Sequence, residues 1–294
     1  AVISYLDARP AHFYQMESTV DGRRFATPRG WEDLSRLLEV YEKLGKTVDR
    51  EVTAQYIENP RIAKDFAAYL ELYYKYQSEY QIGAILSGTV SESVISRASR
   101  AAFDERFSVV NLILSHLNGE FREAGKREEM ISLLFGRLKE IRDERDLSLL
   151  ERLARELDEE AEKQRKAGLI DREQEYLMRS AEKYAGILKK EGGTEFEPGF
   201  ERVRELFLKD REAYESFCDE TLQKLERGFD FLEAAFGDSQ EMVLFVTGLT
   251  ASRSGVGFLR EHECERYYEY NRRLLFEDQE SGILERLNRL EERG

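Results

Sequence analysis

The positions of the prolines constrain the fold of this 294-residue chain more than any other feature. Pro10, Pro28, Pro60 and Pro198 are the four prolines, so residues 61–197 form one proline-free stretch. Proline interrupts helices, and the residues that dominate this stretch (Leu, Glu, Ala, Arg and Lys) have high helix propensity. The sequence therefore predicts an all-α fold.

The charge balance bears on partners. Charged residues make up 35% of the chain, the net charge is −14 and 41% of residues are hydrophobic, which indicates a folded, soluble protein. Nucleic acids and anionic membranes bind clustered Lys and Arg. The pairs Arg23-Arg24 and Arg272-Arg273 are too short to form such a cluster. We therefore expect neither nucleic acid nor a membrane as a partner.

The cysteines and the chain ends suggest a location. Cys218 and Cys264 are too few for a disulfide framework, which favours a reducing cytoplasm. The run "MVLFV" is far shorter than a membrane span, and "AVISYLDARP" lacks the pattern of a signal peptide. The chain also begins without Met, so either the Met was removed or the chain is an excised fragment.

Residues 1–82 are predicted to form a first domain of short helices. "VISYLDA" precedes Pro10, which opens the next turn, and "ESTVDGRR" is predicted as a polar turn. A helix then starts at Pro28, with Gly45 as the candidate residue that ends it. Its apolar residues follow helical spacing: Leu34, Leu37, Leu38 and Tyr41.

Two more helices complete this first domain. "DREVTAQYI" is predicted to form a short helix, and Pro60 opens a longer one. The second carries an aromatic stripe that could be a binding surface, but amphipathic packing explains it more simply. The stripe comprises Phe66, Tyr69, Leu70, Tyr73 and Tyr74.

Residues 83–294 are predicted to form a larger helical domain. Asn118-Gly119 is expected to break its first helix, and a long, charged, antiparallel helical hairpin is expected at about residues 120–192, projecting from the body. Asp171, with Gln174 three residues on, is a candidate helix cap between its arms. The two seams of the hairpin follow three- and four-residue spacing: Leu147, Leu150, Leu153 and Leu157; then Tyr176, Leu177, Ala181, Tyr184 and Leu188.

The C-terminal third contains one predicted loop and one ambiguous segment. Residues 191–199, "EGGTEFEPG", are predicted to form a loop. Asp238 and Glu241, three residues apart, form a capping pair that favours a helix for "EMVLFVTGLTAS". The β-branched residues of this segment are also compatible with a strand.

No complete active site can be assembled from the residues. "GLTASRSGVG" lacks the lysine and the glycine spacing of a phosphate-binding loop, GxxxxGK[ST]. "HECE", with His262 and Cys264, lacks the second pair that a metal site needs, and a solvated face with one packed cysteine explains it better. His12 and His116 have no nucleophile arranged beside them, and the carboxylates are too many for a catalytic pair to be chosen.

The first turn of the helix at Pro28 contains an arginine whose position needs an explanation. Thr27 is a good N-cap and Pro28 a favoured first residue, which puts Arg29 in the first turn. A cation there opposes the helix dipole, at a cost of about 0.3–1 kcal/mol. Arg29 either lies over Trp31 or pairs with Glu32 or Asp33 at the surface, or it binds an anion together with the helix N-terminus. Gly30 would then remove side-chain bulk beside the anion.

The segment "FATPRGWEDLSRLL" resembles the sensor 2 segment of AAA+ ATPases of the MoxR type. The flanking segments "AVISYLDARPAHFYQ" and "DREVTAQYIENPRIAKDFAAYLELYYKY" resemble the rest of that family's small helical lid. The resemblance covers about the first quarter of the chain. It implies that Arg29 is the sensor 2 arginine, which reaches the γ-phosphate of ATP, and that Thr27 caps its helix.

The family's P-loop, acidic Mg²⁺-binding motif, sensor 1 and arginine finger precede the lid, and none is in this sequence. The resemblance thus implies a C-terminal portion of a longer ATPase that uses ATP and Mg²⁺ and remodels a client protein, as a chaperone would. The partners would be the AAA+ core domain and that client, and the parent would work as a ring, as AAA+ relatives commonly do. This chain alone should be catalytically inactive.

Other interpretations remain. The chain could be a stand-alone helical interaction or adaptor protein without nucleotide chemistry, with Arg29 a surface residue. It could also be an enzyme whose site goes unrecognised among the helices. The predicted hairpin is either an arm for a partner or a structural spacer.

Overall fold

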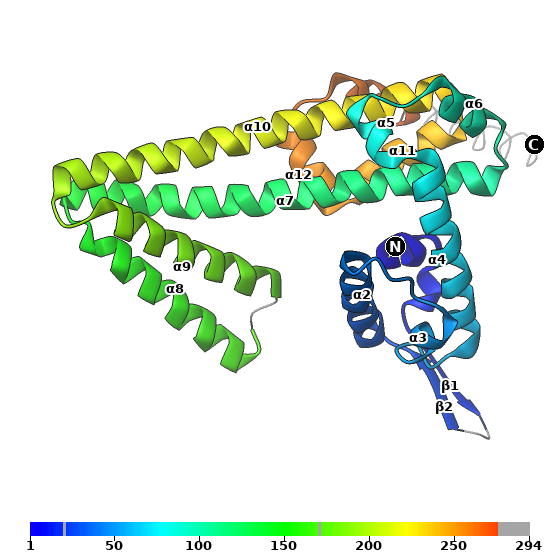
Figure 1. Cartoon of the computed structure of the whole chain (residues 1–294), viewed down its shortest axis with the longest axis horizontal. Coiled ribbons are helices and arrows are strands. Elements are labelled where there is room, and N and C mark those ends of the chain that lie inside the picture. The colour runs from blue at the N-terminus through cyan, green and yellow to red at the C-terminus, as the bar shows by residue number, and fades with distance from the viewer. Residues whose placement is uncertain (20–21, 170–171, 276–294) are drawn as a thin grey trace, which may run out of the picture. The chain divides into compact units, whose positions relative to one another are not determined.

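The computed structural model describes residues 1–19, 22–169 and 172–275, and within these ranges its regular secondary structure is helical apart from one small sheet (Figure 1). The all-α prediction is thus confirmed. In chain order the elements are α1 (Val2–Ala8), the 3₁₀ helix η1 (Pro10–His12), β1 (Gln15–Thr19), β2 (Gly22–Ala26), α2 (Pro28–Lys43), α3 (Arg50–Ala54), α4 (Pro60–Tyr80), α5 (Ile82–Ser87), α6 (Glu92–Arg100), α7 (Phe103–Glu144), α8 (Ser148–Ala167), α9 (Arg172–Gly192), α10 (Phe196–Phe236), α11 (Gln240–Ala251) and α12 (Arg253–Glu261).

The small sheet is a β-hairpin where the sequence predicted only a polar turn. Strands β1 and β2 pair antiparallel, with Met16 opposite Phe25 and Glu17 opposite Arg24. Gly22 has φ +126°, a backbone conformation that glycine adopts readily. The prediction of "ESTVDGRR" as a turn was wrong for the flanking residues, because five-residue strands are too short for a clear period-2 pattern.

The described residues form two compact units. The first comprises residues 1–117, 224–250 and the described part of 265–294, and the second comprises 118–223 and 251–264. Helices α7 and α10 contribute residues to both units. Residue 83, the predicted start of the second domain, falls inside the first unit.

The N-terminal part of the first unit has an aromatic core. Tyr5, Trp31 and Phe66 are almost fully buried, and their ring centroids lie 5.0–5.6 Å apart. Leu70 of α4 is also buried, and Tyr69 and Tyr74 pack against the same cluster. The aromatic stripe of α4 therefore packs into a core, as the sequence indicated. Each large aromatic buried here contributes substantially to the stability of the fold.

Helix α11 packs within the first unit. Phe245 meets Phe229 of α10 edge to face at 5.1 Å, and a Cβ atom at Gly248 would overlap Leu114 of α7. The segment predicted as helix or strand is thus a helix. Glu241, the second residue of α11, is 4% exposed and forms an ion pair of 3.0 Å with Arg106 of α7.

The second unit contains the predicted helical hairpin in a shorter form. Helices α8 and α9 lie side by side (Figure 1), and α8 ends at Ala167, with Gly168 as its C-cap at φ +66°. Asn118-Gly119 does not break a helix, because α7 runs without interruption to Glu144. The candidate cap Asp171 lies outside the described residues.

The hairpin buries most of its predicted seams. Leu147, Leu150, Leu153 and Leu157 are all under 9% exposed, and Ala181 and Leu188 are fully buried opposite them. Tyr176, however, is 63% exposed, so its place in the second seam was wrong. The core of this unit also takes in residues of α7 and α10, among them Leu138, Val203 and Phe207.

The predicted loop at residues 191–199 is mostly helical. Helix α9 continues to Gly192, and α10 begins at Phe196 with Pro198 in its first turn, where proline is tolerated. A Cβ atom at Gly199 would overlap the carbonyl of Gly192. These two glycines therefore allow the ends of α9 and α10 to approach closely, so the glycine-rich stretch does not form a long loop.

Candidate functional site

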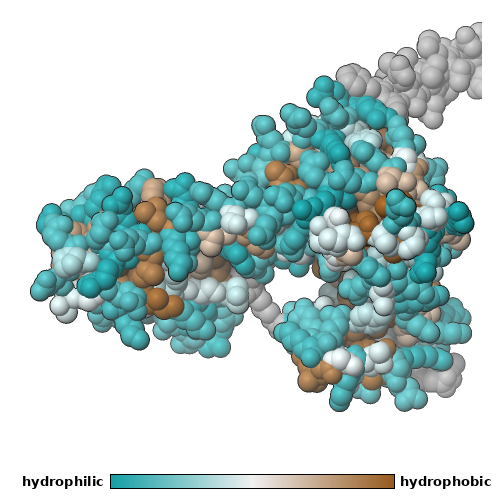
Figure 2. Space-filling model, turned by 45° about the horizontal axis from the view of Figure 1, so that its top comes forward, coloured by the Kyte–Doolittle hydropathy of each residue, from teal (hydrophilic) through white to brown (hydrophobic). Residues whose placement is uncertain are grey.

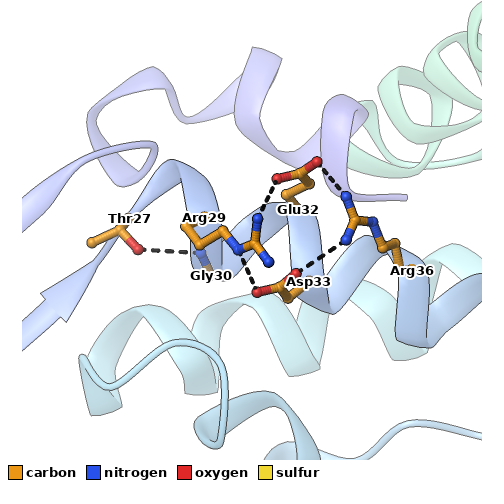
Figure 3. Close-up of polar contacts among 6 residues, drawn as sticks. All are labelled: Thr27, Arg29, Gly30, Glu32, Asp33 and Arg36. Atoms are coloured by element: carbon orange, nitrogen blue, oxygen red, sulfur yellow. Dashed lines mark hydrogen bonds and ion pairs between the residues drawn. The ribbon is translucent and has the colours of Figure 1, made fainter. Parts of the chain in front are cut away.

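The start of helix α2 is built as the sequence predicted (Figure 3). Thr27 is extended, with φ −131° and ψ 153°, and its Oγ1 accepts a hydrogen bond of 3.1 Å from the backbone N–H of Gly30. Pro28 is the first helical residue. Thr27 is therefore an N-cap that satisfies one of the free donors of the first turn.

Arg29 pairs with carboxylates of its own helix. Its Nε donates to Oδ2 of Asp33 at 2.9 Å, and its Nη1 lies 3.7 Å from Oε2 of Glu32. The Arg29 side chain is 66% exposed, whereas Trp31 is buried. The structure thus places Arg29 at the surface, paired with Asp33 and Glu32.

A second arginine shares the same two carboxylates. Arg36 contacts Glu32 at 2.5 Å and Asp33 at 3.5 Å (Figure 3). On one face of α2 the two acidic residues, at i+3 and i+4, lie between the two arginines, at i and i+7. Exposed pairs of this kind contribute about 0.2–1 kcal/mol each. Such weak pairs would let the Arg29 guanidinium exchange Asp33 for a stronger acceptor.

The backbone of this first turn offers few donors. Pro28 has no N–H, and the N–H of Gly30 already donates to Thr27. The helix N-terminus therefore contributes less to anion binding than its position alone suggests. An anion here would be recognised chiefly by the Arg29 guanidinium, whose planar, forked donors match a phosphate.

Gly30 has a packing role. A Cβ atom at this position would overlap the carbonyl oxygen of Tyr56 and lie 3.5 Å from Ile57, which is fully buried. Glycine thus lets the first turn of α2 approach the segment after α3. This close approach sets the position of Arg29 relative to the core.

A polar network that the sequence did not reveal lies beneath the helix. Tyr5 donates to Oδ2 of Asp65 at 2.9 Å and contacts Nδ1 of His12 at 2.7 Å, while Arg9 pairs with Asp65 at 2.9 Å. Burial raises the pKa of Tyr5, and the Asp65 carboxylate raises this pKa further. The indole N–H of Trp31 donates to the carbonyl of His12 at 3.0 Å. His12 thus supports the core around α2.

Two other segments that the sequence singled out pack within the fold. In "HECE", Cys264 is buried and the ring of His262 packs on Phe258 at 4.5 Å. In "GLTASRSGVG", Gly248 lies inside α11 and Gly255 in the first turn of α12, where its N–H donates to Ser252. Across the residues that the structure describes, no three His, Cys, Asp or Glu side chains are grouped as metal ligands would be.

Comparison with known protein families, with curated proteins and with solved structures found no match for this chain.

In the described ranges no single helix has both the length and the apolar composition to cross a membrane, although α11 and α12 taken together, as a bent pair, do. The functional assignment therefore rests on the geometry around Arg29 and on the sequence of its segment.

Proposed function

We propose that this chain is the C-terminal portion of a MoxR-like AAA+ ATPase, in which residues 1–82 serve as the lid and Arg29 senses the nucleotide. The observation that carries the proposal is an exposed arginine in the first turn of a capped helix, paired with exposed carboxylates of that helix. The segment "FATPRGWEDLSRLL" supports the same role through its resemblance to sensor 2.

The proposed mechanism is a contact that differs between two nucleotide states. With ATP bound, Arg29 leaves Asp33 and pairs with the γ-phosphate, and after hydrolysis and phosphate release it returns. Because Arg36 also contacts Glu32 and Asp33, these carboxylates keep a positive partner when Arg29 moves. The difference in binding free energy between the two states would shift the lid and drive remodelling of a client protein.

The parent ATPase would supply the nucleotide-binding motifs and the partners. ATP and Mg²⁺ would be held by the P-loop and acidic motif of the AAA+ core, so this chain alone would turn over no ATP. The partners would be that core and a client protein, with the parent as a ring. We place the activity in the cytoplasm, because the two cysteines of the chain, Cys218 and Cys264, are too few for a disulfide framework.

The proposal is tested first in the gene and then in the enzyme. The coding sequence upstream of Ala1 should contain GxxxxGK[ST] in the same reading frame, followed by an acidic strand end. In the encoded ATPase, Arg29→Ala should lower ATP turnover at least about 10-fold. Arg36→Ala is the matched control, since it removes an arginine that shares the same carboxylates. Equal turnover in the Arg29→Ala and wild-type enzymes would refute the sensor role.

The alternative is a stand-alone helical interaction protein. It is favoured by an apolar groove between α7 and α10 in the second unit. A start codon directly before Ala1, with no upstream P-loop, would favour this alternative and leave Arg29 as a surface residue.

A further inference from the structure

Helices α7 and α10 form an apolar groove in the second unit. It has a volume of about 180 Å³ and is lined by residues 135–142 of α7 and 200–211 of α10. Phe135 and Phe207 stack across it with ring centroids 6.2 Å apart. Because Phe207 also belongs to the core of this unit, the groove is an open extension of that core.

Large apolar side chains of this groove remain accessible to solvent. Phe135 is 48% exposed and Leu208 is 40% exposed, beside the buried residues Leu138 and Val203. On the face that Figure 2 shows, hydrophobic residues form scattered patches on a mostly hydrophilic surface. Exposed apolar residues that adjoin a buried floor are typical of a surface that binds a partner.

The rim of the groove is basic in an acidic protein. Lys139 and Arg142 of α7 and Arg204 and Arg211 of α10 line it, and none of the described lining residues is acidic. The whole chain carries 59 acidic and 45 basic residues, so a local excess of cations is a departure from its composition. The complement of this rim is an acidic ligand.

The rim cations contact exposed partners on their own helices. Arg142 pairs with Asp143, Arg204 with Glu201 and Arg211 with Glu215, all at the surface, while the Lys139 ammonium lies 4.3 Å from the centre of the Phe135 ring. Exposed same-helix pairs contribute about 0.2–1 kcal/mol. Carboxylates of a ligand that also buries apolar surface can therefore displace them.

The spacing of the lining residues matches a helical ligand. On α10 the lining residues recur at i, i+3, i+4, i+7, i+8 and i+11 from Phe200, a stripe about 16 Å long at 1.5 Å per residue. On α7 they recur at i, i+3, i+4 and i+7 from Phe135. A third helix can lie in the groove between these two, with its apolar face down and acidic residues toward both rims.

We propose that this groove binds an amphipathic, acidic helix of a partner protein, about three turns long. Apolar contacts with Phe135, Phe207 and Leu208 would supply affinity, and the four rim cations would select for acidic flanks. This surface lies entirely within the second unit and its residues take no part in the site at Arg29, so the inference does not depend on the proposed ATPase function.

The test uses the full chain and a labelled synthetic peptide of about 15 residues, with leucines at i, i+3, i+4 and i+7 and glutamates beside them. A matched peptide carries lysine in place of each glutamate. Fluorescence anisotropy should show binding of the acidic peptide that weakens as salt rises, and affinity for the lysine peptide at least about 10-fold lower.

Two variants locate the binding surface. Leu208→Glu and Arg211→Glu should each weaken acidic-peptide binding about 10-fold or more. Arg152→Glu is the matched control for Arg211, since Arg152 also pairs with a glutamate four residues on and is equally exposed. Circular dichroism checks that each variant is folded.

Three results would overturn the proposal. They are equal affinity for the two peptides, unchanged binding in the Leu208→Glu and Arg211→Glu variants, and dimerisation of the chain without peptide that Leu208→Glu abolishes. The last result would identify a second copy of this chain as the ligand.

Discussion

The Nε atom of Arg29 lies 2.9 Å from Oδ2 of Asp33, one helical turn further along α2. This contact gives the Arg29 guanidinium a partner on its own helix, a carboxylate that Arg36 also contacts. The three side chains are one-third to two-thirds exposed, which keeps the contact weak. The structure therefore combines a defined position for Arg29 with a low cost of moving it.

Removing the cap of α2 should destabilise the protein more than removing Arg29. Thr27→Ala loses the hydrogen bond from Gly30 and should lower the free energy of unfolding by about 1 kcal/mol. Thr27→Ser keeps the hydrogen-bond acceptor, so it should change the free energy of unfolding by only a few tenths of a kcal/mol. Arg29→Ala should cost less than about 1 kcal/mol. Urea unfolding followed by circular dichroism measures the free energy of unfolding of all three variants. An unchanged value for Thr27→Ala would show that the cap does not stabilise the protein.

Adding one methyl group to Gly30 should destabilise the fold, although alanine is the better helix former. The new Cβ atom would overlap the Tyr56 carbonyl, so Gly30→Ala should lower the free energy of unfolding by about 1–3 kcal/mol. At Gly119 in α7 nothing lies within 4 Å of the added Cβ. Gly119→Ala should therefore stabilise the protein by about 0.5–1 kcal/mol. If Gly30→Ala and Gly119→Ala changed the free energy of unfolding in the same direction, this account of the packing would be contradicted.

The ion pair between Arg106 and Glu241 should matter more than any surface pair. Glu241 is almost fully buried, so Arg106→Met leaves its charge without this partner and should cost about 3 kcal/mol. This is the low end for a buried pair, since the Arg106 side chain is 30% exposed. The double variant Arg106→Met/Glu241→Met should recover much of the loss. Thermal unfolding of the single and double variants measures the difference.

The stability of the protein should fall at alkaline pH, and Tyr5 should contribute to that fall. Burial and then Asp65 raise the pKa of Tyr5 in the folded state above its ordinary value of about 10. Below pH 10 the phenol keeps its proton in both states. Above it, the unfolded chain loses the proton while the folded chain retains it, which favours unfolding.

Tyr5→Phe removes this titration and should flatten the decline of unfolding free energy between pH 9 and pH 11 (about one unit either side of that ordinary pKa). Burial also raises the pKa of Tyr74 and Tyr80, so part of the decline should remain. Urea unfolding at several pH values measures the slope. An identical slope in the variant and the wild type would mean that Tyr5 ionises equally in both states.

Much of the N-terminal fold was predictable because its signals are local. Thr27 and Pro28 mark the start of α2, and Pro60 marks the start of α4. The same local rules failed at Asn118-Gly119, where glycine suggested a helix break. Leu117 and Phe121 are buried on either side of that pair, so packing of α7 outweighs the roughly 1 kcal/mol that glycine costs a helix.

The candidate site was partly predictable for the same reason. The pairing of Arg29 with Glu32 and Asp33 follows from i, i+3 and i+4 spacing on one helix. The network of Tyr5, His12 and Asp65 could not be predicted, since 60 residues separate Tyr5 from Asp65. The conflict between Gly30 and the Tyr56 carbonyl likewise appears only in three dimensions.

The most direct test of the central claim compares the affinity of the encoded ATPase for a non-hydrolysable ATP analogue and for ADP, in wild-type and Arg29→Ala proteins. Trp31, the only tryptophan of this chain, lies two residues from Arg29 and can serve as a local reporter. If Arg29 contacts the γ-phosphate, the variant should lose about 10-fold or more in affinity for the ATP analogue and little for ADP. An equal loss for both nucleotides, or no loss for either, would contradict the assignment of Arg29 as a γ-phosphate sensor.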